Sequence, residues 1–196
     1  GIPSYRLEKD VIAAEIDVLR DMGVKFETGV EIGKDKTIAE LRDLGFHAFY
    51  IAIGAQSGRS LGLPGEDVNE VVSGVDFLRT INLGEKTEVT GKVVVIGGGN
   101  VAIDVARSSV RLDSVTQTDL YCLESRENMP AHIEEIEEAL EEDVNINNSW
   151  GPTRIISEDG KTVKKVSGSL KDILETAFYI KKQTGKVGLG YFLNHH

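Results

Sequence analysis

Apolar residues recur at helical spacing near the start of the chain. Five of them, three and four positions apart, predict an amphipathic helix over residues 9–22: Val11, Ile12, Ile16, Leu19 and Met22. Thr37 is a suitable N-cap and predicts a second helix over residues 38–44. Residues 24–28 predict a short strand. The uninterrupted apolar stretch 47–54 predicts a strand that is buried on both faces of a sheet.

The later part of the chain alternates between strand and helix patterns. Residues 75–81 predict a short helix. Alternating strands and helices then follow at residues 92–96, 101–112, 119–123, 134–142 and 144–146. This order predicts an α/β fold with a parallel sheet and crossover helices. Residues 154–166 predict a hairpin with its turn at 158–161, and residues 170–182 predict a last helix.

A glycine-rich motif follows the strand at 92–96 and begins the next helix. Its residues, Gly97-Gly98-Gly99-Asn100-Val101-Ala102, fit the pattern G-x-G-x-x-A. Gly97 allows a sharp turn, Gly99 lets the backbone approach a pyrophosphate, and Ala102 lets the helix pack closely on the strand. The N–H groups of the first helical turn would face the phosphates. We therefore expect these six residues to bind a dinucleotide, and a purely structural turn is the alternative.

The end of the second strand bears on the choice between NADH and NADPH. Glu124, Ser125 and Arg126 stand where a side chain would reach the adenosine ribose. A carboxylate there accepts hydrogen bonds from the ribose hydroxyls and repels a 2′-phosphate, whereas an arginine does the reverse. Because the strand fixes Glu124 more firmly than Arg126, the sequence slightly favours NADH. A solvated charge is the alternative role for Glu124.

Charge and composition narrow the classes of partner. The 196 residues include 22 Lys and Arg and 32 Asp and Glu, a net charge of −10, which argues against nucleic acid as the main partner. No apolar run is long enough to span a membrane and no basic-then-apolar leader opens the chain, so we expect a cytoplasmic protein. No metal-ligand spacing stands out. The single cysteine, Cys122, is expected to be a buried structural thiol.

Acidic residues cluster between positions 134 and 143: Glu134, Glu135, Glu137, Glu138, Glu141, Glu142 and Asp143. Their simplest interpretation is a solvated helix face. A docking surface for a basic partner subunit is the alternative.

Five motifs in order resemble the small (β) subunit of glutamate synthase and its relatives in the pyridine nucleotide-disulfide oxidoreductase superfamily. Besides the glycine motif, continued by Ile103-Asp104, they are Gly1-Ile2-Pro3-Ser4-Tyr5-Arg6-Leu7, Ile51-Ala52-Ile53-Gly54-Ala55, Leu63-Pro64-Gly65-Glu66-Asp67 and Ser125-Arg126-Glu127-Asn128-Met129-Pro130-Ala131. The resemblance covers roughly residues 1–166.

The resemblance implies a flavoprotein. NAD(P)H would reduce FAD, and electrons would leave through iron–sulfur clusters to a partner subunit. It also implies a domain order in which residues 1–56 are part of an FAD-type α/β domain and 57–90 a connector. Residues 91–166 would form the Rossmann-type NAD(P)-binding domain, with 167–196 unassigned. Gly54 would then be a cofactor-binding residue, and the cofactors would carry the chemistry without a catalytic side chain.

Departures from the family pattern limit these expectations. The glycine loop that holds the FAD pyrophosphate and the cysteines that bind iron–sulfur clusters do not occur in these 196 residues. FAD is therefore expected in a full-length parent and not in this fragment, and clusters only outside this chain. The fragment is expected to be inactive alone. Leu123-Glu124 also replaces a frequent arginine pair. The alternative function is a nucleotide-sensing Rossmann module without redox turnover.

Overall fold

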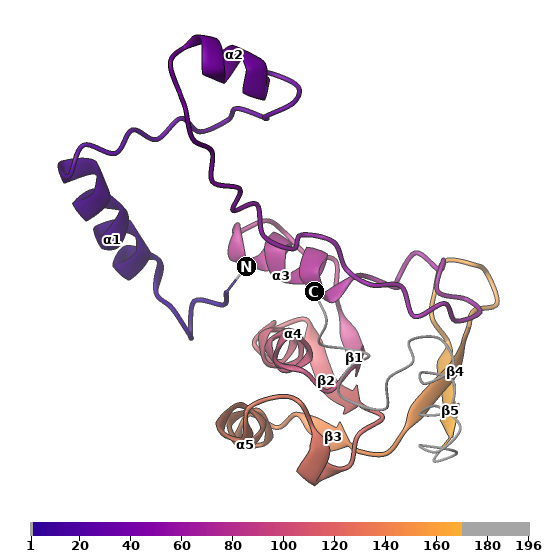
Figure 1. The fold of residues 1–196 in the computed structure, drawn as a ribbon. Coiled ribbons are helices and arrows are strands. Elements are labelled where there is room, and N and C mark those ends of the chain that lie inside the picture. The colour runs from indigo at the N-terminus through magenta and orange to yellow at the C-terminus, as the bar shows by residue number, and fades with distance from the viewer. Residues whose placement is uncertain (1, 170–196) are drawn as a thin grey trace. The chain divides into compact units, whose positions relative to one another are not determined.

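The structure is a computed structural model that describes residues 2–169. The chain divides into two compact units. One unit is residues 4–55, and the other is residues 56–169 together with Ile2 and Pro3. Each unit has its own pattern of secondary structure (Figure 1).

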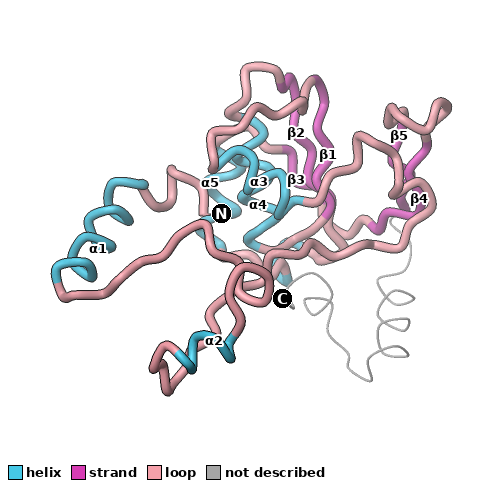
Figure 2. Tube along the Cα trace, turned by 90° about the horizontal axis from the view of Figure 1, so that it is seen from above, coloured by secondary structure: helices cyan, strands magenta, loops and turns pink. Residues whose placement is uncertain are grey.

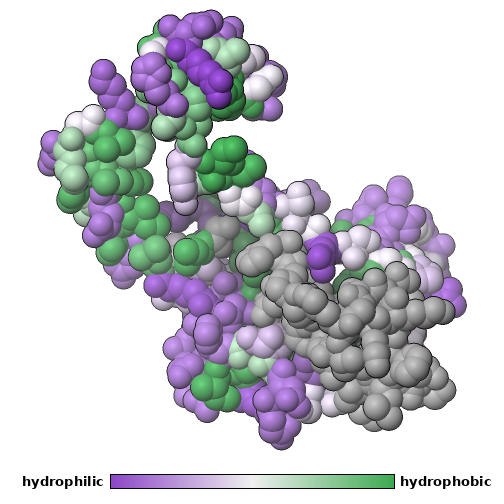
Figure 3. Space-filling view, viewed as in Figure 1, coloured by the Kyte–Doolittle hydropathy of each residue, from purple (hydrophilic) through white to green (hydrophobic). Residues whose placement is uncertain are grey.

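Two helices form in residues 4–55, close to where the apolar pattern predicts them. They are α1 (Lys9–Asp21) and α2 (Ile38–Asp43). Thr37 begins α2 with a capping box: its Oγ accepts the N–H of Glu40 at 3.2 Å, and the Glu40 carboxylate accepts the N–H of Thr37 at 2.7 Å. Neither helix has a buried residue. Apolar side chains of α1 therefore remain on the surface (green in Figure 3).

The two strands predicted in this unit do not form, so that prediction is wrong. Residues 24–28 and 47–54 have no strand hydrogen bonds; the only pairing in residues 4–55 is an isolated bridge between Ile32 and Lys36. Tyr50 is 94% exposed and Ile51 78% exposed, where burial on both faces was expected. A strand needs neighbouring strands to satisfy its backbone groups and to build a covered sheet. Residues 4–55 supply none.

A parallel sheet forms the centre of the second unit and confirms the predicted α/β order. Its strands are β1 (Gly91–Ile96), β2 (Val115–Tyr121) and β3 (Asn145–Asn147), in the spatial order β1-β2-β3. The crossovers are the helices α4 (Asn100–Val110) and α5 (Ile133–Glu141). Helix α3 (Gly74–Asn82) precedes β1. Helix α4 contacts β1, β2, α3 and α5 (Figures 1 and 2).

The core lies between this sheet and its helices. Ile103 and Ala106 of α4, Leu120 of β2, and Ile136 and Ala139 of α5 are at most 1% exposed. The two residues of α4, and likewise the two of α5, are three positions apart and so lie on one face of their helix. Burying this apolar surface favours folding and fixes α4 on the sheet.

The connector before α3 is fastened to an antiparallel hairpin. The hairpin strands are β4 (Gly151–Ile156) and β5 (Lys165–Ser169). The carbonyl of Pro64 accepts the N–H of Ile155 at 2.8 Å, and a Cβ on Gly65 would meet the Ile155 carbonyl oxygen. The Glu66 carboxylate accepts the backbone N–H groups of Leu61, Gly62 and Leu63. The predicted turn at residues 63–67 therefore forms, while the predicted helix at 170–182 lies outside the described residues.

Within residues 2–169, none of the helices has the length and apolar character needed to cross a membrane.

Candidate dinucleotide-binding site

The glycine motif forms the turn between β1 and α4. Gly97 follows β1 with φ of 142°, in the region that favours glycine, and its N–H donates to the carbonyl of Tyr121 at 2.9 Å. Gly99 is the N-cap of α4, with φ −91° and ψ 174°. Ala102 packs against the core. The turn therefore lies at the carboxyl ends of β1 and β2, the edge where parallel α/β sheets bind ligands.

Four backbone N–H groups at this turn have no acceptor among residues 2–169. They belong to Gly99, Asn100, Val101 and Ala102. The first backbone bond into the helix comes from Ile103, whose N–H donates to the carbonyl of Gly99 at 3.1 Å. Unpaired N–H groups and the positive end of the helix dipole form an anion-binding site. The local chemistry therefore fits a phosphate group.

Gly98, to which the sequence pattern gave no specific role, lies against Glu124. A Cβ on Gly98 would be 2.8 Å from Oε2 of Glu124 and 3.1 Å from Cβ of Cys122. The second glycine is thus needed because two side chains that follow β2 lie beneath the turn. The sequence offers no signal for this contact, since the partners are 24 to 26 positions away.

Glu124 is fully buried, at 0% exposure. Neither carboxylate oxygen has a hydrogen-bond partner of normal geometry among the described residues. Its backbone carbonyl, in contrast, accepts the N–H of Ser149 at 3.0 Å and Nδ2 of Asn148 at 3.2 Å. Burial raises the pKa of the Glu124 carboxyl, against a smaller opposing effect of its own backbone N–H. The structure therefore places this side chain under the turn; its contact with a ribose stays a prediction.

Arg126 and Ser125 lie in the short segment after β2. Arg126 begins the 3-10 helix η1 (Arg126–Asn128), and Oγ of Ser125 accepts Nδ2 of Asn128 at 2.9 Å. Arg126 is partly exposed. No carboxylate of residues 2–169 forms an ion pair with it. Its positive charge is therefore available to an anion near the end of β2.

Cys122 is a buried structural thiol, as predicted. It is 2% exposed, and its Sγ accepts Nδ2 of Asn148 at 3.2 Å. Burial, with a smaller contribution from the Glu124 carboxylate, raises the pKa of the thiol to about 11. Such a thiol is not a nucleophile near neutral pH.

Gly54 is the one predicted cofactor residue outside the second unit. It has φ of 69° and lies in residues 4–55, whereas the other predicted site residues lie in residues 97–102 and 124–126. In the part of the chain that the structure describes, no group of three or more His, Cys, Asp or Glu side chains is arranged to hold a metal ion.

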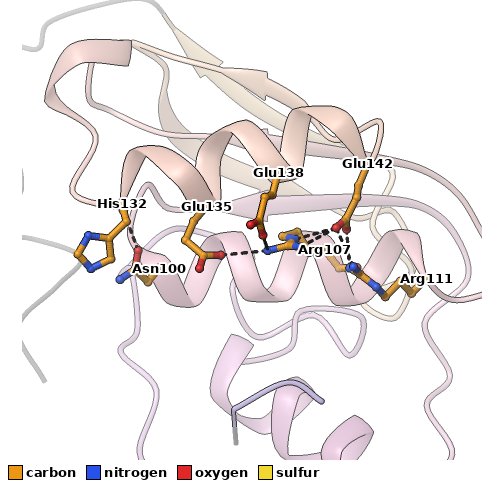
Figure 4. Close-up of polar contacts among 7 residues, drawn as sticks. All are labelled: Asn100, Arg107, Arg111, His132, Glu135, Glu138 and Glu142. Carbon is orange, nitrogen blue, oxygen red and sulfur yellow. Dashed lines mark hydrogen bonds and ion pairs between the residues drawn. The ribbon is translucent and has the colours of Figure 1, made fainter. Parts of the chain in front are cut away.

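The acidic helix α5 is not simply a solvated face. Arg107 of α4, only 5% exposed, forms ion pairs with Glu135 at 3.0 Å, Glu138 at 2.5 Å and Glu142 at 2.6 Å (Figure 4). Arg111 pairs with Glu142 at 2.5 Å. This α4–α5 ion-pair cluster fastens the helix that begins at the glycine turn. The solvated-face interpretation is therefore wrong for Glu135 and Glu142, whereas Glu138 is paired but still 52% exposed.

Comparison with known proteins gives the family. The family model described as pyridine nucleotide-disulphide oxidoreductase matches residues 5–181. The chain belongs to this family. The resemblance inferred from the five motifs is therefore confirmed.

Several curated proteins are similar to this chain over most of its length. It is 40% identical to the NADP(+)-dependent formate dehydrogenase subunit beta of Moorella thermoacetica over 82% of its length. It is 37% identical to the NADPH-Fe(3+) oxidoreductase subunit beta of Geobacter sulfurreducens over 85%. It is 35% identical to the glutamate synthase [NADPH] small chain of Azospirillum brasilense over 74%. The matches span between 23% and 32% of these relatives' own lengths.

A solved structure shows the same fold. Mycobacterium tuberculosis FprA, in complex with NADPH, matches with a TM-score of 0.62 at 16% identity. The match covers 86% of this chain and 56% of that one. The expected α/β fold with a Rossmann-type parallel sheet is therefore confirmed.

Proposed function

We propose that this chain is the nicotinamide-dinucleotide-binding part of a flavoprotein oxidoreductase. The observation that supports this most directly is the set of four N–H groups, at residues 99–102, that have no acceptor within residues 2–169 and lie at the carboxyl edge of a parallel sheet. They would hold the pyrophosphate, with residues 97–99 allowing its close approach. Residues 91–166 would be the dinucleotide-binding domain, joined by the connector 57–90 to residues 1–56 of an FAD-type domain, where Gly54 would lie near the flavin.

The nucleotide we propose is NADPH. The expectation of NADH depended on a Glu124 carboxylate that faces the ribose, and that carboxylate is buried under Gly98. Arg126, partly exposed and without an ion-pair partner in residues 2–169, would instead bind the 2′-phosphate. The names of the similar proteins from Moorella, Geobacter and Azospirillum also specify NADP(+) or NADPH. The preference for NADH that the sequence favoured has not been tested, and titration of both nucleotides into the chain decides between the two.

In this role the residues of the chain would bind the nucleotide and orient it. When bound, the nucleotide supplies a hydride that a flavin of the complete protein would accept. The N–H groups of residues 99–102 would anchor the pyrophosphate, and Arg126 would set the position of the adenosine end. The electrons would pass on to iron–sulfur clusters or a partner subunit outside this chain.

Calorimetric titration of NADPH and NADH into the chain tests the site. Valine at position 99 is compatible with the φ and ψ of Gly99 but blocks the approach of a phosphate, so Gly99→Val should weaken both nucleotides while circular dichroism stays unchanged. Arg126→Gln should weaken NADPH about tenfold to a hundredfold and leave NADH unaltered. Arg154→Gln, an exposed arginine on β4, is the matched control.

Three results would contradict the proposal. They are no measurable binding of either nucleotide, unchanged affinity in Gly99→Val, and tighter binding of NADH than NADPH by the parent chain. The last result alone would restore the NADH prediction and leave the site assignment intact. Oxidation of NADPH by the complete protein with an artificial electron acceptor would separate an oxidoreductase from a nucleotide sensor.

A further inference from the structure

The segment that leads into α5 is fastened to the glycine turn. The N–H of Ala131 donates to the carbonyl of Gly98, with an N···O distance of 3.1 Å. The N–H of His132 donates to Oδ1 of Asn100, the first residue of α4, at 3.0 Å (Figure 4). His132 is the N-cap of α5. Two hydrogen bonds thus connect the start of α5 to the turn that precedes α4.

The first of these bonds sets the direction of a donor in the turn. The peptide between Gly98 and Gly99 is trans and planar, so its carbonyl and its N–H point in opposite directions. When the Gly98 carbonyl is held by Ala131, the Gly99 N–H is directed away from the 129–132 segment. Gly99 is one of the four residues whose N–H groups have no acceptor in residues 2–169.

The Asn100 amide contributes its acceptor to this arrangement. A backbone N–H is always a donor, so the atom that faces His132 must be the amide oxygen. Met129 and Ala131 are buried, at 8% and 7% exposure, which seats the segment against the core. His132 itself is exposed, so packing does not hold this end of the segment. The hydrogen bond to Asn100 holds it instead.

We propose that Asn100 is a positioning residue for dinucleotide binding. Its side-chain oxygen holds the 129–132 segment on the glycine turn and so aligns the N–H groups that receive the phosphates. Asn100 acts through Ala131 and Gly98, and its side-chain amide N–H groups are not needed for the nucleotide. This role rests on the proposed function.

Two substitutions separate positioning from direct contact. Asn100→Ala removes the acceptor and leaves the His132 N–H unpaired. It should weaken NADPH about tenfold in calorimetry, the equivalent of one lost hydrogen bond. Asn100→Asp keeps an acceptor, loses both amide donors and adds a negative charge. Because the added charge repels the phosphates, its affinity relative to the parent's should also fall at low salt, but this loss should shrink at about 1 M salt, whereas the loss in Asn100→Ala should persist. Asn145→Ala, an exposed asparagine at the amino end of β3, is the matched control.

Hydrogen exchange of the free protein provides a readout that needs no nucleotide. The amides of Ala131 and His132 should exchange faster in Asn100→Ala and at the parent's rate in Asn100→Asp. If the loss of affinity in Asn100→Asp persists at about 1 M salt and equals that of Asn100→Ala, the missing amide donors contact the phosphates directly and the positioning role is wrong. If Asn100→Ala speeds exchange but binds NADPH normally, the bond is structural only and the role is again wrong. Failure of the proposed function would already be visible as absent binding by the parent chain.

Discussion

A buried carboxylate beneath the glycine turn is the most unusual residue of the second unit. Glu124 is fully buried and no donor satisfies its oxygens within residues 2–169. Burial raises its pKa above 4.5, the ordinary value. Between pH 4.5 and the folded pKa, Glu124 keeps its proton in the folded protein and loses it in the unfolded chain. The free energy of unfolding therefore falls as the pH rises through this range.

Glu124→Gln should therefore be more stable than the parent at pH 7, by roughly 1–3 kcal/mol, because glutamine does not ionise. The difference should shrink towards zero as the pH falls below 4.5. Urea unfolding across this pH range measures it. Glu66→Gln is the control and should change stability in the opposite sense. Burial raises the Glu66 pKa, but hydrogen bonds from backbone N–H groups and from Ser60 outweigh burial and lower it. Parallel pH profiles for Glu124→Gln and the parent would contradict the expectation.

The sequence predicts residues well when their role depends on neighbours along the chain. Gly97 makes the sharp turn that was predicted for it and Ala102 packs against the core, whereas the role of Gly99 at a pyrophosphate stays a prediction. Gly98 and Glu124 are different, because their contact joins the turn to the residues after β2. A local pattern identifies a residue type at a turn but does not show which distant side chain packs beneath it.

At the scale of elements, the α4–α5 ion-pair cluster holds α4, the helix that begins at the glycine turn, against α5. Arg107→Met would leave Glu135, Glu138 and Glu142 without their common cation. We expect a loss of about 2–4 kcal/mol, between the values typical of exposed and of fully buried ion pairs. Arg111→Met should cost less than about 1 kcal/mol, because Arg111 is 40% exposed. Urea unfolding of both variants gives the comparison.

Acid should weaken the same cluster. Burial raises the pKa of Glu142, but hydrogen bonds from Arg107 and Arg111 outweigh burial and lower it below 4.5. The stability that Glu142 contributes is therefore complete above pH 4.5 and is lost as the pH falls through its folded pKa. Arg107→Met should lose most of this acid sensitivity. Equal destabilisation by Arg107→Met and Arg111→Met would show that burial does not strengthen these pairs.

The sequence predicts a helix or strand correctly when the residues of that element alone define its pattern. Helix α1 follows from its apolar spacing, α2 from its N-cap, and α4, α5 and β1 from the alternation of helix and strand patterns. The expected strand at 47–54 fails because its apolar character indicates burial without supplying the neighbouring strands. The ion pairs of α5 were missed because Arg107 is 28 to 35 positions from Glu135 and Glu142.

At the scale of the whole molecule, the two units should differ in resistance to protease. Residues 47–56 form neither helix nor strand, and Ile51 and Ile53 are 78% and 79% exposed. Thermolysin, which cleaves beside apolar residues, should cut first in this stretch among residues 4–169. Mass spectrometry of the early fragments identifies the site. Ile103 and Leu120, both 0% exposed, are the internal controls. First cuts between residues 91 and 156 would contradict this ranking.

Trp150 is a natural fluorescent probe near the carboxyl end of β2. It is the only tryptophan of the 196 residues. Its backbone N–H donates to the carbonyl of Cys122 at 2.9 Å, and its ring meets that of Tyr121 edge-on at 6.3 Å. Indole emission overlaps the absorption of reduced nicotinamide and not that of the oxidised form. If nucleotide binds at the proposed site, the fluorescence of this one native chromophore should therefore report the reduced form by energy transfer, without a dye, and distinguish it from the oxidised form.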